Sequence, residues 1–380
     1  MIKKLYRILL KKKILSNVNK MPENKNYKRA LLIYLIQPFK QRANSSKFRF
    51  HTNYWGNIEI AKILGEFGYI VDVIDYNNSK IKLKRNYDLV IGQGNAMKEI
   101  INKQSKETIK IYFATGSAFD FHNQQEKKRV EEANKRHKSN LEMIRKTDSD
   151  LNILKLFDAI ICFGNDAIVS TFRPHFKKEI YNFNNYGYDE TAFLLKNKNY
   201  QESRKNFLFM SGSGKVLNGL DLLLDVFKKR PNLNLYIGGS FKGEQDFVKC
   251  FYKELYQSPN IHTQGWINIG GERYNQLIAK CGIIVTAVCT AGSLGSVVVC
   301  MNNGLIPLVT KESGIDTENF GITLRSDSLK DIGETIDWIS KQSPDWHKLK
   351  SEETYKIARR KFSQKAFRYK LNNIFKTIGI

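Results

Sequence analysis

The sequence predicts two α/β domains in tandem, each with a parallel sheet covered by helices. The chain has 380 residues, which is longer than a single hydrophobic core usually serves. Apolar runs of strand length alternate with segments of helical periodicity in two series, separated by a polar stretch at residues 181–206. Runs that are apolar throughout are typical of parallel strands whose two faces are both covered by helices.

The first series starts at residue 29 with a βαβ unit. An apolar run at 29–36 is followed by a helical pattern at 58–68 and a second apolar run at 69–76. Three more strands are expected at 87–94, 109–116 and 157–165. Ligands of such sheets bind at the carboxyl ends of the strands. The residues expected along that edge are Gln93, Gly94, Thr115, Gly116, Ser117, Gly164 and Asn165.

The stretch between residues 119 and 150 interrupts the first series. It is strongly charged and has few apolar positions. This pattern predicts exposed helices, inserted after the fourth strand, whose charges mostly face solvent.

The second series repeats the alternation and ends in helices. Its strands are expected at 206–214, 233–240, 261–266, 283–288 and 304–310, with helical patterns between them and at 328–340. The predicted division is a basic segment and linker at 1–28, an N-terminal domain at 29–185, a C-terminal domain at 186–345 and a helical segment at 346–380.

Residues 1–11 combine basic and apolar positions. Taken as a helix, Lys3, Lys4, Arg7 and Lys11 fall within an arc of about 100°, and apolar residues cover most of the rest. Such a segment suits an anionic membrane surface, and a solvated basic tail is the alternative. No apolar run approaches the ~20 residues that span a bilayer, and no secretory signal is recognisable. We therefore expect a cytoplasmic protein, peripheral at the inner face of the membrane.

The charge balance is strongly basic, with 62 Lys and Arg against 37 Asp and Glu, a net charge of +25. Such a chain attracts nucleic acid, anionic lipid or phosphorylated substrates. The lysines are spread along the whole chain and no nucleic-acid-binding motif is present, so no specific nucleic-acid partner is expected. The five cysteines and six histidines show no ligand spacing, so no metal is expected.

The turn at residues 211–215, Ser-Gly-Ser-Gly-Lys, follows a predicted strand. Backbone N–H groups of a glycine turn at a helix N-terminus, together with a cation, bind a diphosphate well. A tight connection that uses glycine for its backbone freedom is the alternative.

Residues 300–307 read Cys-Met-Asn-Asn-Gly-Leu-Ile-Pro, and here the chain resembles glycosyltransferases of the family-4 type, in particular a bacterial surface-glycan subgroup. Residues 185–189 are similar to the family's Asn-Gly-x-Asp crossover between domains. The resemblance covers roughly residues 29–380. Its other segments are Gly212 with 218–224, 265–267, 311–316, 51–55 and 113–116.

This resemblance implies the GT-B architecture, in which two Rossmann-like domains face an interdomain cleft and a C-terminal helix crosses back to the first domain. It also implies transfer of a sugar from a nucleotide diphosphate sugar to a glycan or lipid-linked saccharide, in lipopolysaccharide or capsule synthesis. The C-terminal domain would bind the donor and the N-terminal domain the acceptor. Neither a metal nor a cofactor is implied, and retention of anomeric configuration is the family default.

The donor site implied by the resemblance lies around two loops. Lys215 and the amides of Ser213 and Gly214 would stabilise the charge of the leaving diphosphate. Glu312 would accept hydrogen bonds from ribose or sugar hydroxyls, and a surface glutamate is the alternative. The remaining expected donor residues are Gly212, Asn218, Gly292, Ser293, Leu294, Gly295 and Ser296.

In the N-terminal domain, His122 and Asp120 lie where the family often places a catalytic or sugar-contacting histidine. Histidine exchanges a proton near neutral pH, and aspartate serves as a base or stabilises positive charge. A structural role for both residues is the alternative. The expected acceptor residues are His51, Thr52, Asn53, Thr115 and Gly116, with helix capping as the alternative for Thr52 and Asn53.

The chain departs from the family in its acidic residues. The family carries two glutamates separated by seven residues in the donor loop, and alignment on Met301 and Gly304 places Ala291 and Val299 there. The usual lysine at the following helix start is Asn218. A non-catalytic homologue that serves as a scaffold or partner is therefore an alternative to an active transferase. A related hydrolysing epimerase is a further one, which the crossover motif disfavours.

Overall fold

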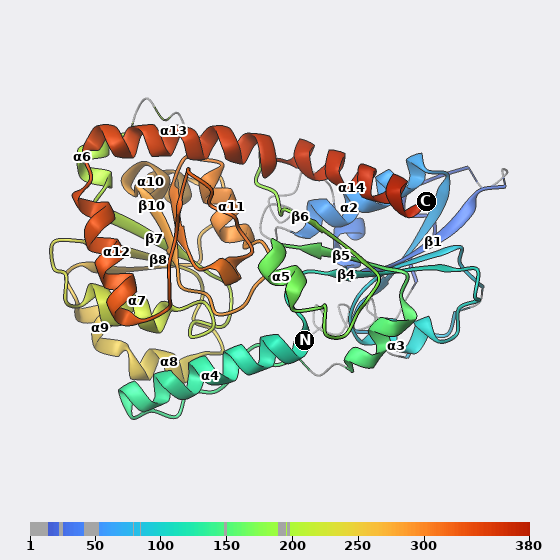
Figure 1. The fold of residues 1–380 in the computed structure, drawn as a ribbon, viewed down its shortest axis with the longest axis horizontal. Helices are drawn as coiled ribbons and strands as arrows, with labels where there is room; N and C mark the ends of the chain where they lie inside the picture. The colour runs from blue at the N-terminus through green and yellow to red at the C-terminus, as the bar shows by residue number, and fades with distance from the viewer. Residues whose placement is uncertain are drawn as a thin grey trace.

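A computed structural model describes residues 14–22, 26–41, 53–78, 80–83, 85–147, 150–188, 195 and 198–380. It has two six-stranded sheets, and all neighbouring strands within them are parallel (Figure 1). The predicted α/β fold with two parallel sheets is confirmed.

The first sheet is built from the first half of the chain and has the order β2-β1-β3-β4-β5-β6. Its strands are β1 (Lys28–Tyr34), β2 (Tyr69–Asp75), β3 (Leu89–Gly92), β4 (Ile109–Ala114), β5 (Ala159–Phe163) and β6 (Glu179–Phe183). Its helices are η1 (Gln37–Lys40), α2 (Asn53–Glu66), α3 (Asn95–Ile101), α4 (Phe119–His137), η3 (Leu151–Leu156) and α5 (Asp166–Ser170).

The second sheet has the order β12-β11-β10-β7-β8-β9. Its strands are β7 (Asn206–Met210), β8 (Asn234–Gly238), β9 (Ile261–Gly265), β10 (Ile283–Thr286), β11 (Ile306–Val309) and β12 (Ile322–Thr323). Its helices are α6 (Tyr200–Ser203), α7 (Leu220–Phe227), α8 (Gln245–Cys250), α9 (Tyr252–Gln257), α10 (Glu272–Lys280), α11 (Gly295–Met301), η6 (Lys311–Ser313) and α12 (Leu329–Lys341).

Two segments that the sequence analysis treats as linkers are held by the first sheet. Strand β6 pairs with β5 and occupies the start of the polar stretch, so the connection between the sheets begins only after Phe183. At the other edge, Leu15 and Val73 exchange backbone hydrogen bonds of 2.9 and 2.8 Å, and Val18 donates to Val71. Residues 14–22 therefore cover part of the exposed edge of β2, which would otherwise offer unpaired backbone groups.

The C-terminal helices α13 (Pro344–Lys361) and α14 (Gln364–Ile378) run from the second sheet back to the first (Figure 1). The crossing point is pinned, because Gly187 donates a hydrogen bond of 2.7 Å to the carbonyl of Phe362. On the far side, Arg368 forms ion pairs with Glu59 and Glu66 of α2. The predicted return of a C-terminal helix to the N-terminal domain is confirmed.

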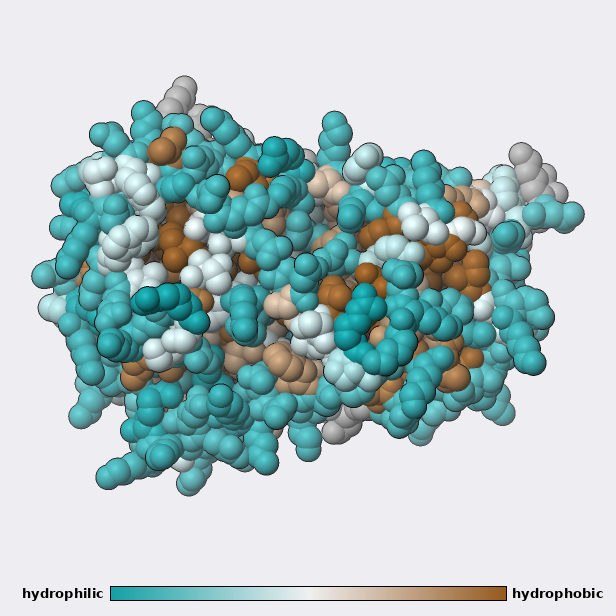
Figure 2. All heavy atoms as spheres, viewed as in Figure 1, coloured by the Kyte–Doolittle hydropathy of each residue, from teal (hydrophilic) through white to brown (hydrophobic). Residues whose placement is uncertain are grey.

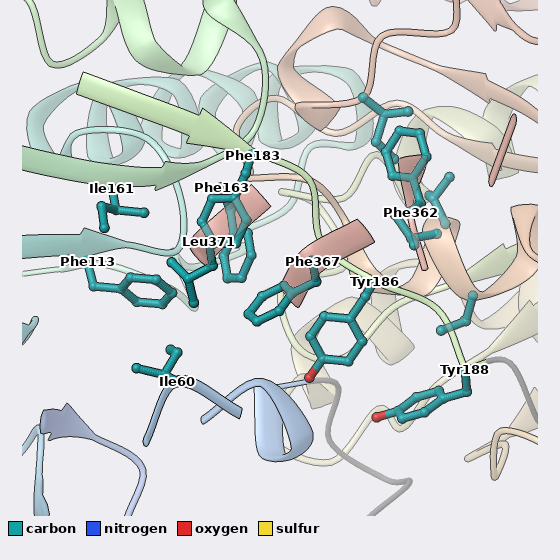
Figure 3. Close-up of a cluster of buried hydrophobic side chains, with 14 of the residues drawn as sticks. Ile60, Phe113, Ile161, Phe163, Phe183, Tyr186, Tyr188, Phe362, Phe367 and Leu371 are labelled. Atoms are coloured by element: carbon teal, nitrogen blue, oxygen red, sulfur yellow. The ribbon is translucent and has the colours of Figure 1, made fainter. Parts of the chain in front are cut away.

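An aromatic cluster anchors α14 to the first domain (Figure 3). The Phe367 ring lies 5.2 Å from that of Phe183 and 5.0 Å from that of Tyr186, measured between centroids. Phe163 stacks on Phe183 at 4.6 Å. Phe367 is 2% exposed, so burial of its ring contributes to holding the helix in place.

Helix α4 differs from the prediction of a solvated insertion. It leaves the first sheet and runs along the second domain beside α8 (Figure 1). Val130 and Ala133 join the hydrophobic core of the second domain. Arg129, which is 2% exposed, donates to the carbonyl of Ala287 at 2.8 Å and to Asp327 at 2.7 Å. Most charged residues of the insertion are exposed, as predicted, but a few, such as Arg129, have partners in the other domain, far away in sequence.

Hydrophilic side chains cover most of the face seen in Figure 2, and hydrophobic ones gather in the hollows between them. No helix among the described residues is long and apolar enough to cross a bilayer. The amphipathic pattern predicted for residues 1–11 lies outside the described residues.

Phe367→Ala should lower the free energy of unfolding by about 3–5 kcal/mol, because it empties the centre of the aromatic cluster. Tyr369→Ala on the same helix is the matched control, since Tyr369 is 70% exposed and its loss should change stability by less than about 0.5 kcal/mol. Urea denaturation of the three proteins measures the difference. Equal stability of both variants would show that the cluster does not anchor α14.

Candidate functional site

A cavity of about 880 Å³ lies between the two sheets. The carboxyl ends of strands from both domains form its walls, as the parallel topology requires. Most of the predicted site residues line this cavity. Those that line it are Gln93, Gly94, Asn53, Thr115, Gly116, Ser117, His122, Gly212, Ser213, Asn218, Gly292, Leu294, Gly295 and Ser296.

Other predicted residues lie away from this lining. Gly164 packs under Ile168, and Asn165 bonds to Asp316 at 2.9 Å outside the cavity. Glu312 lies 3.8 Å from Lys311 in an ion pair and also does not reach the cavity. His51 and Thr52 lie outside the described residues.

The two walls of the cavity touch each other at Gly292. A Cβ atom on Gly292 would lie 2.7 Å from both the Gly116 Cα and the Thr115 carbonyl oxygen. Beside this contact, the buried hydroxyls of Ser117 and Thr290 are hydrogen-bonded across the domain boundary. Only glycine at residue 292 permits the domains to approach this closely.

The glycine turn after β7 is already satisfied by a carboxylate of its own domain. Glu244, which is 2% exposed, accepts hydrogen bonds from the amides of Gly214 at 2.9 Å and Lys215 at 2.7 Å. The Asn218 side chain donates a hydrogen bond of 2.7 Å to the carbonyl of Gly214 and so stabilises the turn. The amide of Gly214, which was predicted to bind the diphosphate, therefore bonds to Glu244 instead.

The Lys215 ammonium is directed into the protein and away from the cavity. Its side chain is fully buried and bonds to the Ser211 hydroxyl, at 3.2 Å, and to the Gly212 carbonyl. The ring of Phe241 lies 5.1 Å below the ammonium. Burial lowers the pKa of Lys215 to about 8, against the opposing effect of the Glu244 carboxylate. Lys215 supports the turn from inside in this structure.

The loop that contains residues 292–296 presents its backbone to the cavity, with one exception. Ser293 is buried at a positive φ of 36°, where its hydroxyl accepts from the Asn185 amide at 2.9 Å. Its carbonyl accepts from the Asn185 side chain at 3.1 Å. Ser293 therefore connects the donor-side loop to the chain crossover, while its neighbours face the cavity.

His122 and Asp120 both lie at the start of α4 but have different surroundings. His122 lines the cavity, and its Nε2 lies 3.0 Å from the carbonyl of Arg145. Burial, reinforced by the Arg145 charge, lowers the pKa of His122, so it is neutral at pH 7. Asp120 is absent from the lining and pairs with His175 at 2.8 Å.

The residues at the family's two glutamate positions have different surroundings. Ala291 lines the cavity next to Gly116, where a glutamate would reach its interior. Val299 is fully buried within α11. No Asp or Glu is found among the described residues that line the cavity. No group of three or more His, Cys, Asp or Glu residues within the described part of the chain has a metal-binding arrangement.

Sequence reasoning missed several residues that line the cavity. Arg145 and Lys146 come from the charged insertion, whereas Tyr34 ends β1 and Tyr76 follows β2. Trp266, 54% exposed, forms part of the rim after β9. The tyrosines and the tryptophan could have been found from their position at strand ends, whereas nothing in the sequence ties the insertion to the cavity.

Comparison with known proteins supports the fold assignment. No protein-family profile and no curated protein matches this chain. Sucrose-phosphate synthase from Thermosynechococcus elongatus has a TM-score of 0.65 at 10% identity, covering 93% of this chain and 99% of its own. HepE from Anabaena, in complex with UDP and glucose, has a TM-score of 0.55 at 13% identity, covering 93% and 100%.

A TarM mutant from S. aureus, in complex with fondaparinux, α-GlcNAc-glycerol and UDP, has a TM-score of 0.51 at 12% identity. The match covers 76% of this chain but 55% of TarM. Together with the two facing parallel sheets, these likenesses establish the GT-B architecture for this chain.

Gly292→Ala should force the two cavity walls apart, because the added methyl group meets backbone atoms of the other domain. Overpacking of this kind costs about 1–3 kcal/mol. Gly212→Ala is the matched control, since it lines the same cavity and a Cβ there has no neighbour within 4 Å. Thermal unfolding of both variants measures the effect. Equal melting temperatures would contradict the direct contact between the walls.

The His122 side chain should titrate below the ordinary histidine value, which is about 6.5. The folded protein binds this proton less readily than the unfolded chain does. Its contribution to stability is therefore complete above the ordinary value and falls as the pH drops below it. NMR titration of the imidazole, assigned by comparison with His122→Gln, gives the pKa directly. A midpoint above the ordinary value would contradict the structure.

Proposed function

We propose that this protein is a glycosyltransferase that uses a nucleotide diphosphate sugar as donor. The observation that carries the proposal is the cavity between two Rossmann-like domains, with backbone-rich loops after β7 and β10 on one side and polar strand ends on the other. Its volume of about 880 Å³ is in the range of sites for small organic ligands. The resemblance of residues 300–307 to family-4 enzymes supports the same reading.

The donor side of the cavity is proposed to be the second domain. The Ser211–Ser213 backbone and the loop of Gly292 and Gly295 offer peptide groups without bulky side chains, which suits close approach of a nucleotide diphosphate. The acceptor would enter against the first domain, where Gln93 and Thr115 supply hydrogen-bonding groups, 3.2 Å apart.

The composition of the cavity favours a mechanism without a carboxylate base. Among the described lining residues, His122 is the one histidine, and its Nε2 is engaged with the Arg145 carbonyl. We propose retaining transfer, in which the acceptor oxygen bonds to the anomeric carbon on the face that the diphosphate leaves. The bond between that carbon and the phosphate oxygen breaks, and the departing diphosphate takes the acceptor proton. The protein stabilises the charge of the leaving group without a metal.

The biological role proposed is synthesis of a surface polysaccharide, such as lipopolysaccharide or capsule, at the inner face of the membrane. The net charge of +25 would favour anionic lipid and phosphorylated, lipid-linked acceptors. A second candidate, a non-catalytic partner of an active transferase, is favoured by Ala291, which stands where the family has a glutamate.

Titration calorimetry with a panel of nucleotide sugars tests the proposal. One donor should bind, and NMR should show slow transfer or hydrolysis with the anomeric configuration retained. Gly212→Leu should weaken binding by about tenfold or more, since its side chain would fill the open space at the turn, whereas Gly212→Ala should bind almost normally. Binding without turnover would favour the non-catalytic partner. No binding of any nucleotide sugar would refute both.

A further inference from the structure

We infer that Arg145 and Lys146, from the insertion in the first domain, supply the positive charge that binds the donor diphosphate. This inference rests on the proposed function and identifies the cations of its site. The resemblance assigned that charge to Lys215, which the structure buries. The cations would thus reach the donor from the opposite domain.

The position of Arg145 carries the argument. A Cβ atom on Gly214 would lie 3.2 Å from the Arg145 Cδ and 3.4 Å from its Cγ, so the arginine stem packs over the glycine turn. Arg145 and Lys146 are both exposed, and both line the cavity beside Gly212 and Ser213. A guanidinium at this turn can approach two phosphate oxygens at once.

The segment that carries these cations is held rigidly by α4. The Glu126 carboxylate, on a residue 1% exposed, accepts from the amides of Ile144 and Arg145, each at 3.0 Å. The Asn123 side chain accepts a hydrogen bond from the Thr147 amide at 2.9 Å and donates one to the Thr147 carbonyl at 2.6 Å. With the contact from His122 to the Arg145 carbonyl, three α4 side chains fix the backbone on both sides of Lys146. A backbone fixed in advance reduces the loss of entropy on binding.

The electrostatic character of the cavity points to an anion. Arg145 and Lys146 are the charged residues in its described lining, because His122 is neutral and no carboxylate lines it. Within the described ranges, neither cationic head has an ion-pair or hydrogen-bond partner. Two unpaired cations beside a turn of small residues match the charge of a nucleoside diphosphate.

The other groups predicted to bind the diphosphate, in the second domain, already have hydrogen-bond partners. The Lys215 ammonium bonds inward to Gly212 and Ser211, and the amides of Gly214 and Lys215 are taken by Glu244. Use of these groups by the diphosphate would require Glu244 to be displaced, whereas Arg145 and Lys146 need no rearrangement.

The test uses the full chain and four nucleoside diphosphates: UDP, GDP, ADP and CDP. The one that binds most tightly is compared with its nucleoside, which has no phosphate, by calorimetry. Arg145→Met keeps the stem that packs on Gly214 and removes the charge, and it is combined with Lys146→Met. Lys127→Met combined with Lys128→Met is the control, because both lysines lie on α4 of the same insertion, with side chains 69% and 70% exposed, and their loss removes the same two charges.

The double variant should bind the diphosphate about ten- to hundredfold more weakly, as expected for lost hydrogen bonds between charged groups, with the nucleoside unaffected. The affinity of the double variant for the diphosphate should also depend less steeply on salt concentration. The control should change affinity less than about twofold. Unchanged diphosphate affinity in a folded double variant would overturn the inference and leave the proposed function standing. If none of the four diphosphates binds the wild-type protein, the proposed function fails, and the inference with it.

Discussion

The packing of α4 against the second domain is the constraint on which the arrangement of the site depends. Arg129 is a buried charge, and a buried guanidinium is tolerated only when its donors are satisfied. Its partners, Ala287 and Asp327, belong to the other domain. At the C-terminal end of α4, Arg136 pairs with Asp221, and His137 lies 2.8 Å from Asp225. Moving the domains apart would expose these groups or leave them without partners.

The two domains are therefore connected at further places besides the expected crossover. The segment at 184–188 and the junction between α13 and α14 cross side by side, linked by the bond from Gly187 to Phe362. On another side of the cavity, α4 reaches across in the opposite direction. With Gly292 packed on Gly116, these connections hold the cavity walls in one relative position and give the loop of Arg145 its place over the donor turn.

The sequence was sufficient to predict the sheets, because nearly every strand is a continuous apolar run that parallel packing buries on both faces. Strand β6 escaped notice because it is an edge strand in which only Phe183 is fully buried. The buried, paired charges of α4 were missed for a different reason. Charges that pair with residues 85 to 198 positions away look the same in sequence as charges that face water.

The location of the site was predictable, whereas the direction of its side chains was not. Gly212, in the turn after a predicted strand, and Gly292, in a loop before a predicted helix, both line the cavity. A lysine after a glycine turn gives no sign of which way it points, and the occupation of the turn amides by Glu244 depends on a residue thirty positions later. The pairing of Asp120 with His175, 55 positions away, was hidden for the same reason.

A crystal structure with the bound nucleoside diphosphate is the most direct test of the role of Arg145. We expect diphosphate oxygens within ion-pair distance of Arg145, with Glu244 still bonded to the amides of Gly214 and Lys215. A diphosphate seated on those amides, with Glu244 displaced and Arg145 turned to solvent, would contradict it.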